Sequence, residues 1–203
     1  MKIVPCVLLL LSAAAFGFEW PASDADIDAL LCEKSAKYRT MSDAVRTRQN
    51  YRFETTQSVP LGMVAGETDK KGLIIQLNPE LKGDRRVSIL IWEMVNAFQR
   101  PRFDEIDKRA RDGTIASHQE FGLRMELIEY DSFRHHREVL EDLQKSIEPI
   151  GPEFVKFLVP QATKLDDYKI PFAHDYIEAQ AKSGHTRHYE KFYYIQTRTK
   201  PPF

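Results

Sequence analysis

The segment from Asp84 to Phe98 limits the possible folds of this chain more than any other. Its apolar residues recur at helical spacing, at Val87, Leu90, Ile91, Met94, Val95 and Phe98, which is typical of a deeply buried helix. Pro101 follows, and we expect this helix to end or bend there because proline lacks the amide hydrogen that a helix needs. This is the most apolar helix after the N-terminal segment, so it should form the core.

Other patterns predict further helices around a small sheet. A helical pattern begins at Ser23, and alternating apolar residues with glycine punctuation predict two or three strands between residues 50 and 78. Ser117 with Glu120 forms a capping box that starts a long helix to about Ile147, and another helix is expected near residues 173–182. The expected class is α+β, helix dominated, with a small N-terminal to central sheet packed on a buried core helix and a long helix.

Residues 1–17 have the composition of a cleavable signal peptide. Lys2 precedes an uncharged apolar run, and small residues follow at positions 12–15 and 17, which is the order of such signals. The apolar run is shorter than the roughly 20 residues that span a bilayer, so cleavage after Gly17 is preferred over a membrane anchor. We expect an exported protein, periplasmic or secreted, whose residues 18–203 form a single globular domain without stable membrane insertion.

Charge and cysteine content exclude several classes of function. The chain has 29 Lys and Arg residues against 30 Asp and Glu residues, so a nucleic-acid or membrane-surface role is not expected. Cys6 lies within the signal, which leaves Cys32 as the one thiol of the exported part, and no internal disulfide can form there. We expect Cys32 to be a buried small residue on the first helix. An intermolecular disulfide is the alternative.

The core helix carries the motif Trp92-Glu93-Met94-Val95-Asn96. This segment resembles the metal-binding helix of the zincin metallopeptidases, in which the pattern is His-Glu-x-x-His. There, two imidazoles one turn apart hold zinc and the glutamate activates the bound water. The resemblance covers roughly residues 72–145 and implies a zincin-like core of the gluzincin type.

Both zinc-ligand positions depart from that pattern. Trp92 stands at the first position and cannot bind zinc, and Asn96 at the second is a poor ligand. The resemblance therefore implies a degenerate site, for which we expect no cofactor and no metal-dependent peptidase activity.

Glu93 is the informative residue of the motif, because a carboxylate among apolar neighbours is costly to bury without a partner. In the structural interpretation it caps a polar cluster, or it pairs with an arginine such as Arg85, Arg86 or Arg124 to fix helix packing. In the functional interpretation it is a catalytic general base or a remnant site in a pocket. The structural interpretation is preferred, since buried ion pairs are common structural features.

The long helix supplies the other candidate pocket residues. Glu129, Ser132 and His136 share one stripe of this helix, and Glu126 begins another. The resemblance places a carboxylate ligand of gluzincin-type members on this helix, at Glu126 or Glu129. If these residues meet Trp92, Glu93 and Asn96, they form a polar pocket, in which Glu129 and His136 are a weak alternative metal pair. The competing interpretation is solvated histidines and helix-stabilising ion pairs.

The C-terminal part offers weaker signals. His185 and His188 are expected in a loop, and the aromatic residues Tyr189–Tyr194 are expected in the core or in a strand, which could bind a partner. An extended tail is predicted over residues 195–203.

These observations leave three functional hypotheses. The leading one is an exported, zincin-like protein that has lost its peptidase activity and binds a protein or an envelope component. The second is a metal-assisted or acid/base hydrolase that uses Glu93, Glu129 and His136. The third is an exported inhibitor or immunity-type protein that blocks a partner by shape.

Overall fold

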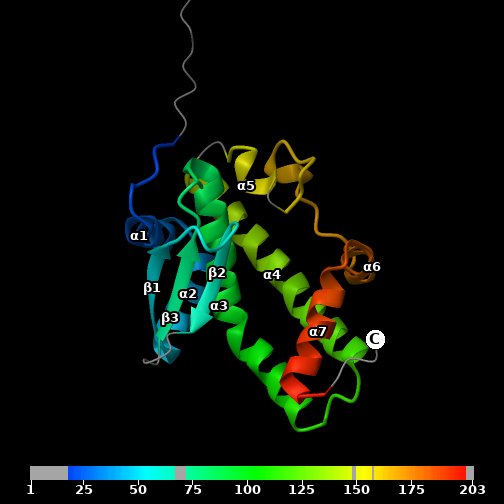
Figure 1. Ribbon diagram of the computed structural model, residues 1–203. Coiled ribbons are helices and arrows are strands. Elements are labelled where there is room, and N and C mark those ends of the chain that lie inside the picture. The colour runs from blue at the N-terminus through cyan, green and yellow to red at the C-terminus, as the bar shows by residue number, and fades with distance from the viewer. Residues whose placement is uncertain (1–17, 67–71, 148–149, 157, 200–203) are drawn as a thin grey trace, which may run out of the picture.

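The computed structural model describes residues 18–66, 72–147, 150–156 and 158–199, so the predicted signal peptide lies outside the described residues. In chain order the elements are α1 (Asp24–Lys34), α2 (Ala36–Arg48), β1 (Asn50–Thr55), β2 (Gly62–Gly66), β3 (Gly72–Leu77), α3 (Gly83–Arg111), α4 (His118–Ser146), α5 (Glu153–Lys156), the 3-10 turn η1 (Leu165–Asp167), α6 (Ala173–Ser183) and α7 (His185–Thr197). Figure 1 shows the small sheet at one side of the molecule beside α1, α2 and α3, with α4, α6 and α7 farther from it, and this content confirms the helix-dominated α+β class.

β3 is the central strand of a three-stranded mixed sheet with the order β1-β3-β2. It pairs in parallel with β1 and antiparallel with β2. Leu73, Ile75 and Leu77 alternate along β3 and are buried, because successive side chains of a strand point to opposite faces. The strands predicted between residues 50 and 78 are confirmed, and the sheet packs on α3 through β2 and β3.

α1 and α2 form a helical pair beside the sheet. Ser23 and Ser35 begin the two helices, because each hydroxyl oxygen accepts a backbone hydrogen bond from the first turn. The buried carboxylate of Asp28 on α1 pairs with Arg46 on α2 at 2.6 Å. Cys32 is a free, partly buried thiol on α1, and burial raises its pKa.

α3 is one continuous helix with Pro101 inside it, so the helix does not end at this proline. Proline removes the amide that would bond to the Ala97 carbonyl one turn earlier. The guanidinium of Arg48 on α2 replaces that donor: its Nη2 atom lies 3.3 Å from the Ala97 oxygen and 3.1 Å from the Phe98 oxygen. The helix continues because a distant side chain satisfies the freed carbonyl.

α4 confirms the predicted long helix and packs against α3. Its cap is Ser117, whose Oγ accepts from the Glu120 amide at 3.1 Å. The two helices carry two hydrophobic clusters: the main one includes Ile91 of α3 and Leu140 of α4, and a second one includes Ile106 and Phe121 near the loop that joins them. Among the described residues, no helix is both long and apolar enough to span a bilayer.

α6 confirms the helix predicted near residues 173–182, but α7 corrects the predictions for the C-terminal residues. Residues 185–188 begin a helix instead of forming a loop, and Tyr189–Tyr194 lie on that helix instead of a strand. The extended tail is wrong for residues 195–197, which end the helix, while residues 200–203 lie outside the described residues. Gly184, with φ of 86°, separates α6 from α7. Figure 1 shows α7 lying along α4, and this packing stabilises the helix.

Candidate functional site

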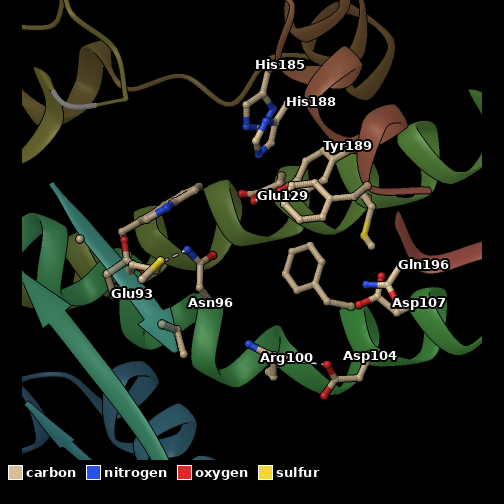
Figure 2. Close-up of a pocket in the computed structure, with 17 residues that line it drawn as sticks. Glu93, Asn96, Arg100, Asp104, Asp107, Glu129, His185, His188, Tyr189 and Gln196 are labelled. Atoms are coloured by element: carbon tan, nitrogen blue, oxygen red, sulfur yellow. Dashed lines mark hydrogen bonds and ion pairs between the residues drawn. The ribbon is translucent and has the colours of Figure 1, made fainter. Parts of the chain in front are cut away.

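A cleft of about 700 Å³ opens between β2, α3, α4 and α7. It lies between the two hydrophobic clusters, since Trp92 packs on the main cluster while Phe103 and Tyr189 pack on the second. Figure 2 shows that α3, α4 and α7 each contribute polar side chains to this cleft, including Glu93, Asn96, Glu129, His185 and His188.

Glu93 lines the cleft as a buried carboxyl group with 6% exposure. Burial raises its pKa to about 8, the negative charge of Glu129 adds to this rise, and the hydrogen bond from Asn96 opposes it. Glu93 therefore holds its proton at neutral pH.

Two of the arginines named as possible partners of Glu93 pair with other residues. Arg86 pairs with Asp24 at 2.6 Å, and Arg124 pairs with Glu120 at 2.8 Å. The recorded partner of Glu93 is Asn96, whose Nδ2 atom donates to Glu93 Oε2 at 3.4 Å. Among the described residues, this long hydrogen bond is the one found for the Glu93 carboxyl group. A buried carboxyl group so weakly satisfied is costly for stability, which is typical of functional sites.

Asn96 leaves one acceptor unused in the cleft. Its Oδ1 atom is buried, and no donor among the described residues reaches it. Because an unsatisfied buried polar atom costs about 1 to 3 kcal/mol, this oxygen marks a place where a ligand donor would bind favourably.

Gly62 on β2 lets the sheet edge approach Glu93 closely. A Cβ atom at this position would lie 2.7 Å from Glu93 Cγ and 2.9 Å from Ile89 Cγ2. We therefore expect Gly62→Ala to lower the free energy of unfolding by about 2 kcal/mol, because overpacking forces side chains away from their rotamers. Urea unfolding measures this change.

The matched control for this prediction lies on the same strand. A Cβ atom at Gly66 meets no atom within 4 Å, so Gly66→Ala is expected to leave stability unchanged or slightly raised. Equal losses for both variants would contradict the close approach at Glu93.

Glu129 faces Glu93 from α4 and is held by α7. The Tyr189 hydroxyl donates to Glu129 Oε1 at 2.6 Å. Burial raises the pKa of Glu129, while the hydrogen bond from Tyr189 and the nearby His185 oppose the rise. The structure thus brings together four residues predicted for the pocket, Trp92, Glu93, Asn96 and Glu129.

Glu126 lies behind the cleft, where it joins α4 to α7. Its side chain has no exposed surface, and its Oε1 atom lies 2.9 Å from His185 Nδ1 and 3.0 Å from Thr186 Oγ1. This contact with Glu126 raises the pKa of His185. Glu126 therefore positions the start of α7 and does not itself line the cleft.

His136 and Ser132 do not line the cleft. His136 is fully buried, where its Nε2 atom lies 3.2 Å from the Ser88 carbonyl and its Nδ1 atom 3.2 Å from the Tyr168 hydroxyl. The expectation of a solvated His136 is wrong, and the pair of Glu129 and His136 is not assembled, because Glu129 turns toward α7. The Ser132 hydroxyl donates to the Ile128 carbonyl of its own helix.

The sequence interpretation missed the contribution of α7 to this cleft. One helical stripe of α7 lines it, at His185, His188, Tyr189, Phe192 and Gln196. Intervals of three, four and seven residues from the first histidine are the signal of a helix face. The preceding Gly184 favours a loop instead, and this signal led to the prediction of a loop.

The donor set of the cleft does not fit zinc. Trp92 cannot bind zinc, Asn96 is a poor zinc ligand, and His136 does not line the cleft. Across residues 18–66, 72–147, 150–156 and 158–199, no three His, Cys, Asp or Glu side chains are grouped to hold a metal ion. No protein-family model, curated protein or solved structure matches the chain.

Proposed function

We propose that this protein is an exported binding protein on a zincin-like scaffold, which takes a protein or envelope component into its cleft without a metal. The observation that carries the proposal is the pair of Glu93 and Asn96, whose polar atoms face the cleft with one long hydrogen bond between them. Folding alone favours apolar residues at such positions. A concave site with a few convergent polar groups is the usual form of a ligand pocket.

Export rests on the composition of residues 1–17. When the full chain is expressed in a secreting bacterial host, the purified protein is expected outside the cytoplasm and to begin at Phe18. N-terminal sequencing measures the start, and an intact Met1 on cytoplasmic protein would contradict export.

Binding is tested by thermal unfolding of this purified protein with a chelator present. We would screen defined peptides and purified peptidoglycan fragments, and we expect at least one to raise the unfolding temperature. Gly62→Ala should lose this effect and Gly66→Ala should keep it. The proposal fails if no compound stabilises the protein, or if stabilisation is unchanged in Gly62→Ala.

A second candidate function is acid/base hydrolysis, and one observation favours it. Glu93 has a pKa of about 8, lines an open cleft and lies near the second carboxyl group of Glu129. Deprotonated Glu93 would accept the proton of a water molecule that attacks a substrate carbonyl. Hydrolysis of a stabilising compound, with a rate that rises with pH up to about 8 and is lost in Glu93→Gln, would favour this function over simple binding.

A further inference from the structure

The charge that lines the cleft is unbalanced. Carboxyl groups come from Glu93, Asp104 and Asp107 on α3 and from Glu129 on α4. The one arginine in the lining, Arg100, already pairs with Asp104 at 2.9 Å. His185 and His188 also line the cleft, so four acidic side chains face one arginine and two histidines, and the excess of acidic groups requires Glu93 to be ionised.

Aromatic side chains border these carboxyl groups. Trp92, Phe103, Tyr189 and Phe192 line the same cleft. The face of an aromatic ring attracts cations, and this attraction strengthens where water is displaced. Acidic and aromatic groups together favour a ligand that is cationic at one end and apolar along its body.

The hydrogen-bonding groups of Glu93, Asn96 and Glu129 also favour a ligand that carries donors. Asn96 Nδ2 and the Tyr189 hydroxyl already donate to Glu93 and Glu129. The buried Asn96 Oδ1 remains an acceptor without a donor among the described residues. An ammonium or guanidinium group carries only donors, so it complements these acceptors.

We propose that the cleft binds an organic cation, a primary ammonium or guanidinium group on an aliphatic stem, with the charged group between Glu93, Asn96 and Glu129. This inference rests on the proposed binding function and specifies the chemistry of its ligand. The cation is either a free amine or a basic side chain of a peptide.

Binding of the cation is coupled to a proton. Six charged or titratable side chains besides Tyr189 line the cleft with Glu93: Arg100, Asp104, Asp107, Glu129, His185 and His188. Glu93 is protonated at neutral pH, and a cation favours its ionised form. The bound cation therefore displaces this proton, and affinity rises with pH up to about 8.

Isothermal titration calorimetry of the exported protein tests the proposal. The cationic probes are cadaverine, agmatine and lysine amide acetylated at its α-amine (acetyl-lysine-amide), which keeps the side-chain ammonium group. Butanol and glutarate are the neutral and anionic controls. We expect the cations alone to bind and to release protons at pH 7, as shown by different heats in buffers of different ionisation enthalpy. Preference for acetyl-lysine-amide would identify a peptide source, and preference for cadaverine or agmatine a free amine.

Two variants distinguish cation binding in the cleft from a general electrostatic effect of the protein. Glu93→Gln should weaken cation binding about tenfold or more. Glu105→Gln makes the same substitution at an exposed position of α3 outside the cleft, and should not change binding. Equal binding of glutarate, or unchanged affinity in a folded Glu93→Gln protein, would overturn the cation assignment. The binding function itself survives if a neutral or anionic compound stabilises the protein in a Gly62-dependent way.

Discussion

Replacement of Glu93 by glutamine is expected to raise the free energy of unfolding at pH 8 by about 4 kcal/mol. The pKa of Glu93 is about 8 in the folded protein and about 4.5 in the unfolded chain. Between these two pH values the Glu93 carboxyl group binds more protons in the folded state than in the unfolded state. The free energy of unfolding of the wild type is therefore not reduced by Glu93 below pH 4.5, and it falls as the pH rises to 8. Glutamine does not titrate, and its amide can donate to the unused Asn96 Oδ1. The gain should therefore be small at pH 4.5 and grow with pH.

Urea unfolding at several pH values measures this difference between variant and wild type. Glu105→Gln is the matched control, because Glu105 is exposed on the same helix, and it should change stability by less than about 0.5 kcal/mol at every pH. A loss of stability in Glu93→Gln that does not vary with pH would show that Glu93 is a structural residue. A stabilised variant that no longer binds ligand would show the conflict between stability and function that is expected of a binding site.

The parts of the fold that could be predicted from the sequence depend on local patterns. The helix spacing of Val87 to Phe98, the cap at Ser117 and the alternation of Tyr51, Phe53 and Thr55 each predict the observed element. The exceptions depend on contacts between distant residues. α3 continues through Pro101, where Arg48 donates to the freed Ala97 carbonyl, and α7 forms along α4 although its N-cap residue is a glycine without a capping side chain.

Three predicted site residues lie on the helix that carries the motif, and Glu129 is the predicted residue of α4 that joins them in the cleft. Trp92, Glu93 and Asn96 occur on one apolar helix, and their spacing places them near one another. On α4 the spacing of Glu129 and His136 could not show which neighbours each side chain would find. Glu129 forms a hydrogen bond with α7, whereas His136 contacts Ser88 and Tyr168 in the core. Residues on one stripe of α4 therefore lie in different environments.

His136 and Glu93 oppose each other in their effect on stability. Burial lowers the pKa of His136 to about 4, against the hydrogen bond to the Ser88 backbone, which raises it. A neutral His136 is therefore part of the fold, whereas Glu93 must be protonated for full stability. Between pH 4.5 and 6.5 the two contributions have opposite slopes, because protons favour the folded state at Glu93 and the unfolded state at His136.

His136→Gln is expected to remove the part of the stability loss that burial of His136 causes as the pH falls from 6.5 to 4. The folded pKa of His136 is about 4 and its ordinary value is 6.5, so its contribution is full above pH 6.5 and falls by about 3 kcal/mol as the pH drops to 4. At pH 7 the variant should be about 2 kcal/mol less stable than wild type, since it disturbs buried bonds to Ser88 and Tyr168. At pH 4 the difference should vanish or change sign. Urea unfolding at pH 4, 5, 6 and 7 measures it.

His135 supplies the matched control, because it lies on the same helix and keeps partial exposure beside Glu138. His135→Gln should show a much smaller change with pH than His136→Gln. In the double variant Glu93→Gln/His136→Gln, the two effects should add, because the side chains line different environments and share no hydrogen bond. If the stability of His136→Gln follows wild type in parallel from pH 7 to 4, the buried imidazole is not what limits acid stability. If the two changes do not add, the cleft and the His136 network are coupled across Trp92, whose ring lies 6.0 Å from that of His136.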